Sequence, residues 1–265
     1  MKIGFIGVGN MGGAIARAVA KSVNGANLYL TDYCMEKAQE LAGQLSANAV
    51  DQEMVLQVCD YAFLGVKPQV LPGVLESIFG GVQKRQGSLT LISMAAGIAT
   101  KKILQLLPHG TPLIRIMPNT PVGVGAGMVL YTCTDLVSET AKGDFLSMMA
   151  QAGRLDEIPE NLIDAASAVS GCGPAFVCLF AEALADGGVA CGLPRQKAAL
   201  YAAQTLLGTA ALLLESGQNP GTLKDAVCSP GGTTIQGVRA LEEGGFRGAA
   251  MEAVIAAYEK TVALG

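Results

Sequence analysis

The chain has 265 residues, a length that suits two modest domains or one large domain with an appendage. Charged residues make up only 15% of it, against about 25% in ordinary soluble domains, and 51% is hydrophobic, which excludes a disordered chain. The net charge is −4, aromatic residues are few and tryptophan is absent, so the chain lacks the basic or stacking surface that a nucleic-acid-binding protein needs.

The first part of the sequence alternates short strand-like runs with helical patterns, as successive βαβ units do. Strands are predicted at residues 2–6, 27–31, 61–66, 89–93 and 113–117, with two further strands at 128–132 and 154–158. Helices are predicted over residues 14–22 and 35–45 and near 141–150. This alternation predicts an α/β domain with a mainly parallel sheet over residues 1–158.

After Pro159 the strand signals end, and Ala, Leu and Gly dominate. Helices are predicted over residues 162–170, 174–191, 194–215, 233–243 and 248–262. Pro174 and Pro194 suit the first turn of a helix, and Gly217 suits a helix end. With the boundary placed near residues 158–161, we expect residues 159–265 to form an all-α domain.

The surplus of apolar residues must be buried somewhere. The best candidate for a membrane span, residues 198–214, is shorter than the ~20 residues that a span needs, is rich in Ala and contains Gln204. We therefore expect a helix buried between subunits and no membrane association. No basic segment leads into an apolar helix at the N-terminus, and the seven cysteines form no C-x-x-C pair, so we expect a cytoplasmic protein with reduced thiols.

Residues 7–12 read Gly-Val-Gly-Asn-Met-Gly, the G-x-G-x-x-G pattern, between a predicted strand and a predicted helix. Gly7 would permit a tight turn, Gly9 the close approach of a pyrophosphate, and Gly12 close packing of helix on strand. The pyrophosphate would lie on the free N–H groups at the helix start. A merely flexible turn is the alternative, but the strand–turn–helix context favours a dinucleotide site.

Asp32 lies 20 residues after Gly12, at the end of the second predicted strand. A carboxylate at this place can accept a hydrogen bond from a ribose hydroxyl. The alternative is that Asp32 caps the helix that begins near Met35, and the two roles can coexist. Because no basic residue follows Asp32 immediately, we expect NADH to be used at least as well as NADPH.

Residues 229–234 read Ser-Pro-Gly-Gly-Thr-Thr and precede a predicted helix. The N–H groups of Gly232, Thr233 and Thr234 would lie at an uncapped helix start, where they could bind an anion. The alternative is a structural N-cap made by Ser or Thr. No residue of the second domain resembles the acid of a hydroxy-acid dehydrogenase. This favours reduction of an imine, since a protonated C=N bond is already activated for hydride attack.

Several motifs together point to one family. They are Gly4-Phe5-Ile6-Gly7-Val8-Gly9-Asn10-Met11, Val66-Lys67-Pro68-Gln69, Ser93-Met94-Ala95-Ala96-Gly97, Arg115-Ile116-Met117-Pro118-Asn119-Thr120-Pro121, Ser170-Gly171-Cys172-Gly173-Pro174-Ala175 and Cys228-Ser229-Pro230-Gly231-Gly232-Thr233-Thr234. Over essentially its whole length the chain resembles pyrroline-5-carboxylate reductases. The resemblance implies a Rossmann-like NAD(P)-binding domain followed by an all-α substrate-binding and dimerisation domain. It also implies reduction of the imine 1-pyrroline-5-carboxylate to L-proline by NAD(P)H, the last step of proline biosynthesis.

The resemblance also implies roles for particular residues. The expected cofactor-binding residues are Gly7, Val8, Gly9, Asn10, Met11, Asp32, Gln52, Val66, Lys67, Pro68, Met94, Ala95, Ala96 and Asn119. The expected substrate-binding residues are Glu160, Ser229, Gly231, Gly232, Thr233 and Thr234, with Thr234 as the catalytic residue that bonds the ring nitrogen. No metal is expected. Two chains are expected to build each site as a homodimer, and such dimers often assemble into decamers.

Two positions depart from the family pattern. Many members carry Asn or Ser followed by Arg near Asp32, and this chain does not; Ala226 stands where some relatives have Asn. Lys67 is a candidate acid, although a Lys-Pro turn beside a dinucleotide is more often structural. Two other functions remain open from the residues alone: a related imine or keto-acid reductase, and a non-catalytic oligomer that senses a cofactor.

Overall fold

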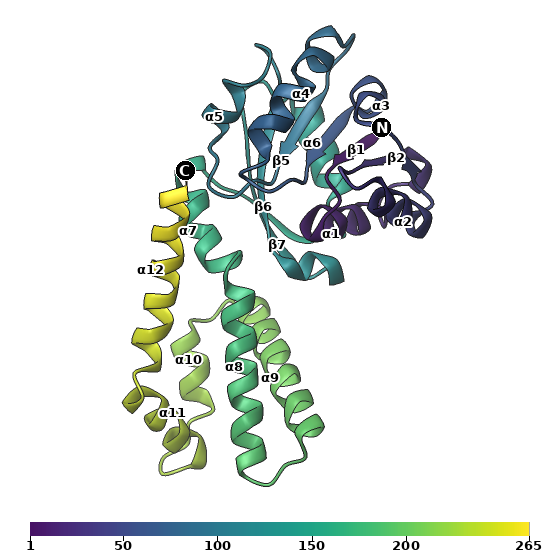
Figure 1. Ribbon diagram of the computed structural model, residues 1–265. Helices are drawn as coiled ribbons and strands as arrows, with labels where there is room; N and C mark the ends of the chain where they lie inside the picture. Colours follow the sequence, from purple (N-terminus) through teal and green to yellow (C-terminus); the bar gives the residue numbers. More distant parts are fainter. Residues whose placement is uncertain (265) are drawn as a thin grey trace. The chain divides into compact units, whose positions relative to one another are not determined.

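The computed structural model describes residues 1–264 and forms two compact units. The first, here the sheet unit, contains Met1–Cys172 and the end of the chain from Ala257; the second, here the helical unit, contains Gly173–Ala256. Figure 1 shows the strands gathered in the first unit and long helices in the second. The domain boundary predicted near residues 158–161 stays a prediction, because these units describe the packing of one chain only.

The sheet has eight strands in the order β3-β2-β1-β4-β5-β6-β7-β8. All neighbouring strands are parallel except β6 and β7, so the predicted α/β class is confirmed. The strands are β1 (Ile3–Ile6), β2 (Leu28–Thr31), β3 (Asn48–Ala49), β4 (Tyr61–Leu64), β5 (Thr90–Ser93), β6 (Leu113–Pro118), β7 (Gly127–Cys133) and β8 (Gly153–Glu157).

Most helices of the sheet unit lie between these strands along the chain, and α7 follows the last strand, β8. They are α1 (Asn10–Val19), α2 (Met35–Leu45), α3 (Gln52–Val58), α4 (Leu71–Lys84), α5 (Thr100–Leu104), α6 (Glu139–Met148) and α7 (Glu160–Ser170), with the short 3₁₀ turns η1 (Gly25–Asn27) and η2 (Thr120–Val124). The helices α3, α4 and α5 were not predicted. They are short or contain Pro and Gly, so their apolar periodicity is weak.

The core of the sheet unit lies on both faces of the sheet. Successive side chains of a strand point to opposite faces. Phe5 and Phe63 therefore lie in one apolar cluster, with stacked rings whose centroids are 4.6 Å apart, and Ile6 and Leu64 lie in the other. Strands buried on both faces explain why these runs are continuously apolar.

Helix α1 begins at Asn10, not at residue 14 as the sequence suggested, so the end of the glycine pattern is helical. The physical reason is packing. A Cβ atom at Gly12 would come within 2.2 Å of the carbonyl oxygen of Gly7. Gly12 thus lets the first turn of the helix pack directly on the turn that precedes it, as expected for this position.

The helical unit contains α8 (Gly173–Ala190), α9 (Arg195–Ser216), α10 (Pro220–Ala226), α11 (Thr233–Glu243) and most of α12 (Phe246–Leu264). The bounds of α11 match the prediction, and Gly217 ends α9 in the left-handed region with φ 62°, also as predicted. Helix α10 was missed. Only three residues of this unit are buried, namely Ala185, Ala198 and Ala202, which lie between α8 and α9.

Candidate functional site

The turn from β1 to α1 has the properties of an anion site. Gly7 has φ 95°, a conformation that glycine adopts without steric cost. The N-cap of α1 is Gly9, which has no side chain to accept from the N–H groups of the first helical turn, and these groups have no acceptor within the helix. A Cβ atom at Gly9 would meet nothing within 4 Å, so these groups can be approached closely. The turn therefore fits a pyrophosphate.

Asp32 ties the end of β2 to this turn. Its Oδ2 accepts a hydrogen bond from the N–H of Val8 at 2.8 Å, and its Oδ1 accepts one from the N–H of Cys34 at 3.0 Å. The alternative role as a helix cap is wrong, because Cys34 is the N-cap of α2. Each carboxylate oxygen can accept a further hydrogen bond, which leaves room for a ribose hydroxyl. The contact with the ribose itself stays a prediction.

A cavity of about 540 Å³ lies beside the glycine turn. Six of the residues predicted to bind the cofactor line it: Gly7, Gly9, Asp32, Gln52, Val66 and Lys67. They follow the carboxyl ends of the neighbouring strands β1, β2 and β4, apart from Gln52 at the start of α3. Ligands of open α/β sheets bind at this edge. The fold thus brings together residues that the sequence separates.

The other predicted cofactor residues also follow strand ends. Met94, Ala95 and Ala96 come directly after β5, in a turn that contains Gly97 with φ 72°. Pro68 lies in the turn before α4, in which the carbonyl of Lys67 accepts from the N–H of Val70 at 2.9 Å. The backbone of Lys67 is therefore part of the turn, and Lys67 also lines the cavity.

Asn119 follows β6 and is buried. Its Oδ1 accepts a hydrogen bond from the N–H of Met128 at 2.9 Å, and its Nδ2 donates one to the carbonyl of Ser170 at 2.9 Å. Both ends of the amide are therefore bonded within the protein, and the side chain joins β6, β7 and α7. A contact between Asn119 and the cofactor stays a prediction.

Glu160 is the first residue of α7, and both of its carboxylate oxygens have partners. Oε1 accepts from the N–H of Thr100 at 2.6 Å, and Oε2 accepts from the Thr100 hydroxyl at 2.5 Å. Arg115 adds an ion pair at 3.3 Å. Burial raises the pKa of Glu160, but the hydrogen bonds from Thr100 and the charge of Arg115 outweigh burial and hold this pKa below its ordinary value of 4.5.

Arg115 belongs to one of the family motifs, but no role was predicted for it. It is only 1% exposed in the middle of β6 and forms a second ion pair with Asp164 at 2.7 Å. An arginine inside a run of buried strand residues is a signal in itself, because a buried charge must be paired. The positions of its partners, 45 and 49 residues away, could not be read from the sequence.

The loop from Ser229 to Thr234 leads into α11. Gly231 has φ 68°, and the N–H of Gly232 donates to the carbonyl of Ser229 at 3.0 Å. Gly232 is the N-cap of α11 and no side chain caps it, so the alternative reading as a Ser or Thr cap is wrong. The N–H groups of Thr233 and Thr234 begin the helix without an intrahelical acceptor, which suits an anion. The individual substrate roles in this loop stay predictions.

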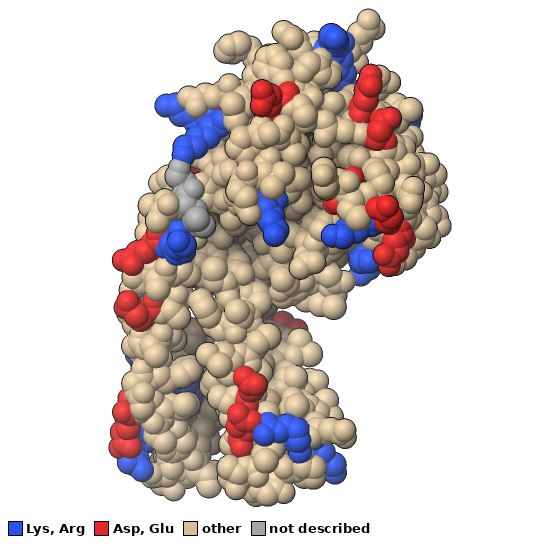
Figure 2. Space-filling model, in the orientation of Figure 1, with Lys and Arg blue, Asp and Glu red and all other residues tan. Residues whose placement is uncertain are grey.

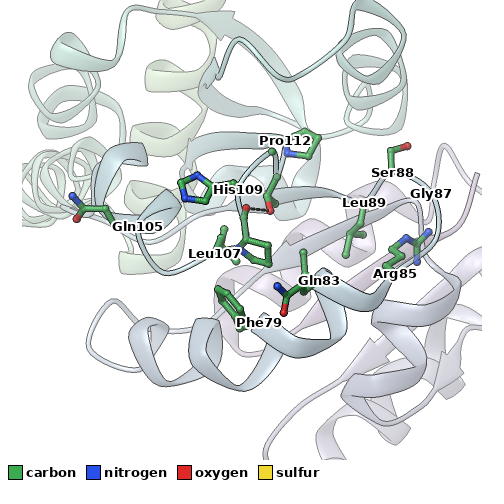
Figure 3. Close-up of a pocket in the computed structure, with 14 residues that line it drawn as sticks. Phe79, Gln83, Arg85, Gly87, Ser88, Leu89, Gln105, Leu107, His109 and Pro112 are labelled. Carbon is green, nitrogen blue, oxygen red and sulfur yellow. Dashed lines mark hydrogen bonds between the residues drawn. The ribbon is translucent and has the colours of Figure 1, made fainter.

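A larger cavity, of about 630 Å³, lies at the opposite edge of the sheet (Figure 3). It is lined by the end of α4 and by the segments that precede β5 and β6. His109 lies there in a loop and is exposed. Because this is the amino edge of the parallel strands, we place the candidate site at the cavity beside the glycine turn. Within residues 1–264, no three His, Cys, Asp or Glu side chains come together as metal ligands.

Two family models match the chain. Residues 160–264 match a model described as pyrroline-5-carboxylate reductase dimerisation, and residues 2–97 match one described as NADP oxidoreductase, coenzyme F420-dependent. Among curated relatives, the pyrroline-5-carboxylate reductase of Escherichia coli (strain K12) is 41% identical over 98% of this chain and 97% of its own length. The corresponding protein of Synechocystis sp. is 46% identical over 81% of this chain and 79% of its own.

Solved structures agree with these relatives. The pyrroline carboxylate reductase of Plasmodium falciparum, solved with NADP bound, has a TM-score of 0.90 at 33% identity and covers 100% of this chain and 98% of its own. The 1-pyrroline-5-carboxylate reductase of Streptococcus pyogenes has a TM-score of 0.88 at 33% identity, covering 99% and 98%.

Proposed function

Because the chain belongs to the pyrroline-5-carboxylate reductase family, we propose that it reduces 1-pyrroline-5-carboxylate to L-proline with hydride from NAD(P)H, the last step of proline biosynthesis. The observation that carries the proposal is the uncapped start of α11 at Gly232. It offers N–H groups to an anion on a chain that already has a glycine turn for a pyrophosphate. A cyclic imine with a carboxylate would use the start of α11, while the cofactor would use the glycine turn.

The residues of the sheet unit fit the cofactor. Free N–H groups at the start of α1 would hold the pyrophosphate, and Asp32 would accept from a ribose hydroxyl. The turns at 66–68 and 94–96, with Gln52 and Asn119, would hold the remainder. NAD(P)H supplies the hydride when bound, and the relative from Plasmodium falciparum was solved with NADP. We propose that this chain uses NADH at least as well, because a 2′-phosphate would meet the Asp32 carboxylate.

The loop of the helical unit would hold the substrate. The N–H groups of Thr233 and Thr234 would bind the carboxylate, with Ser229 and Gly231 shaping the loop. The Thr234 hydroxyl would hold the ring nitrogen: its oxygen accepts from the iminium N–H, and its hydrogen can turn to the amine lone pair after hydride transfer. Orientation of the two reactants then supplies most of the rate gain.

We propose that a second copy of the chain buries the exposed apolar surface of the helical unit. The unit exposes large apolar side chains and contains an apolar groove of about 550 Å³, lined by Phe176, Val177, Leu179, Phe180, Ala183, Leu184, Leu241, Phe246, Ala249, Ala250 and Ala253. On the face drawn in Figure 2, its charged side chains gather at a few places and leave long uncharged stretches. The match to a dimerisation model supports a dimer, and further assembly into decamers follows the family pattern.

A membrane is the alternative environment that could bury the exposed apolar helices. Two helical stretches, Glu160–Ala190 and Arg195–Ser216, are long and apolar enough to cross one by length and composition, which alone is weak evidence. We propose a cytoplasmic oligomer, because the interfaces of obligate dimers are also strongly hydrophobic, so exposed apolar helices need no membrane to bury them.

The proposal is tested by following NADH and NADPH oxidation with 1-pyrroline-5-carboxylate and identifying proline as the product. Turnover only with another imine or with a keto acid would instead support a related reductase. Cofactor binding with no turnover of any of these compounds would support a non-catalytic sensor.

A further inference from the structure

Helix α7 is attached to the sheet at both ends by polar side chains. At its start, Glu160 and Asp164 form ion pairs with Arg115 of β6, at 3.3 and 2.7 Å. At its end, Asn119 donates to the carbonyl of Ser170 at 2.9 Å. Sliding or rotation of α7 along the sheet would break these contacts together, so the position of its first residue is well determined.

From this position Glu160 reaches the start of a different helix. Thr100 is the first residue of α5, and an N–H in the first turn of a helix has no acceptor in its own helix. Glu160 accepts from this N–H at 2.6 Å and from the Thr100 hydroxyl at 2.5 Å. A carboxylate from α7 therefore caps α5, an arrangement that also suits the positive end of a helix dipole.

The capped residue, Thr100, directly follows the turn that joins β5 to α5. This turn, residues 94–99, contains the residues 94–96 that are proposed to hold the cofactor. Ala96 packs against the apolar cluster that includes Ile163 of α7. Helix α7 thus holds the turn at two points, once through apolar packing and once through Glu160 and Thr100.

The ionised form of Glu160 is needed for this arrangement. Arg115 is 1% exposed, and its Nε has no hydrogen-bond partner. Its buried positive charge is therefore compensated by the carboxylates of Glu160 and Asp164. The same ion pair, together with the Thr100 hydrogen bonds, keeps the pKa of Glu160 below its ordinary value despite burial. The carboxylate is therefore charged at neutral pH and available as an acceptor for both groups of Thr100.

We propose that Glu160 is a positioning residue for the cofactor: it caps α5, fixes the turn at residues 94–96, and is itself held in place by Arg115. This role differs from the direct substrate contact that the family resemblance implies, and it rests on the hydrogen bonds that both oxygens of Glu160 accept from Thr100 within the sheet unit. The inference rests on the proposed function for the identity of the reaction, while cofactor binding can be measured without it.

The test measures NADH affinity in the absence of imine, by titration of cofactor fluorescence, on the full chain. In Glu160→Gln the side chain keeps its shape but loses its charge and one acceptor oxygen, and we expect NADH to bind about tenfold more weakly. The KM for the imine should stay within about twofold of the wild-type value. Thr100→Val, which removes only the hydroxyl, should weaken NADH binding about threefold, and it guards against a Glu160 variant that fails to fold.

A double-mutant cycle sharpens the test. Because the two side chains share one contact, the Thr100→Val/Glu160→Gln variant should lose less NADH affinity than the product of the two single losses. Asp164→Asn is the matched control. Asp164 pairs with Arg115 but not with Thr100, so this variant should melt at a lower temperature and keep wild-type NADH affinity.

Two results would overturn the proposal. One is normal NADH affinity in Glu160→Gln together with a raised KM for the imine, which would make Glu160 a substrate contact. The other is an equal loss of NADH affinity in Asp164→Asn, which would mean that any loosening of α7 has this effect. If the wild-type chain does not turn over the imine, the proposed function fails, but the NADH titrations still decide the role of Glu160.

Discussion

In the sheet unit the strands β1, β4 and β5 are buried along their whole length, whereas in the helical unit only Ala185, Ala198 and Ala202 are buried. Large side chains of the helical unit lie in the open instead: Leu179 is 67% exposed and Leu214 is 72% exposed. A unit that buries so little of its apolar surface gains little stability from the hydrophobic effect. The sheet unit has its own hydrophobic core, whereas the apolar side chains of the helical unit are not buried within a single chain.

The polar contacts differ in the same way. The sheet unit places Arg115 in its interior with two carboxylates, where loss of one partner is costly. In the helical unit the ion pair of Arg195 with Asp186 has both side chains more than half exposed, at 57% and 58%. Exposed pairs of this kind contribute little to stability. Neither apolar packing nor ion pairs within one chain therefore account for the stability of the helical unit.

The largest effect is expected from Leu179→Asp in the apolar groove. If a second copy covers this groove, a buried unpaired charge costs several kcal/mol, and we expect dissociation to monomers and loss of most activity. Light scattering after size exclusion and a turnover assay measure both. Leu136→Asp is the control, since Leu136 is a 52% exposed leucine of the sheet unit. A Leu179→Asp protein that stays an active oligomer would contradict the proposed interface.

Arg115→Met should cause the largest loss of stability within the sheet unit. The change leaves Glu160 and Asp164 without their cation, and we expect a loss of about 3 kcal/mol, at the low end for buried pairs because both carboxylates are partly exposed. Urea denaturation measures the free energy of unfolding. Arg154→Met, at an exposed position of β8, should change it by less than about 0.5 kcal/mol. Equal effects of the two substitutions would show that the ion pairs are not needed.

Thr234→Ala tests the chemistry at the helical unit. A hydrogen bond to a charged group is worth about 1.5–3 kcal/mol, so turnover should fall roughly 10- to 150-fold while NADH affinity stays near wild type. Thr234→Ser keeps the hydroxyl and should keep most activity. The N-cap of α11 is Gly232, so the melting temperature should change little. Full turnover in Thr234→Ala would end the catalytic role.

Asp32→Ser tests cofactor choice at the sheet unit. Repulsion between Asp32 and a 2′-phosphate is expected to cost about 1–2 kcal/mol after screening, so the substitution should shift preference toward NADPH by roughly tenfold. Serine can still accept from one of the two N–H groups that Asp32 binds. Values of kcat/KM for NADH and NADPH decide the matter. A strong preference of the wild-type protein for NADPH is the contrary result.

The smallest expected effect is a pH dependence of stability. Because the pKa of Glu160 is lower in the folded protein than its ordinary value of 4.5, Glu160 stabilises the fold above that pH, and this contribution is lost as pH falls through the folded-state pKa. The difference in unfolding free energy between wild type and Glu160→Gln should therefore shrink below about pH 4.5. Unfolding curves of both proteins over this range provide the measurement, and parallel curves would refute the lowered pKa.

Local patterns were enough for the elements whose shape depends on neighbouring residues. The strand–glycine–helix pattern predicted the β1–α1 turn, because only glycine fits φ 95° at position 7 and the close contact at position 12. The change in composition after Pro159 predicted helices there, including α11, and Gly217 predicted the end of α9. The pattern failed for α4, whose Pro72, Gly73, Gly80 and Gly81 weaken the helical signal although the helix is stabilised by packing of Leu71, Leu75 and Ile78.

The sequence by itself determined the α/β class, the glycine turn and the bounds of α11, whereas the structure showed that no side chain caps the start of α11. Only the tertiary structure decided which residues meet. The cavity joins residues that follow three neighbouring strands, and Glu160 meets Thr100 from 60 residues away. Strand order and the placement of α7 depend on packing across the whole sheet, and no local pattern encodes them. A carboxylate that family resemblance links to the substrate therefore lies, in the fold, on the start of α5.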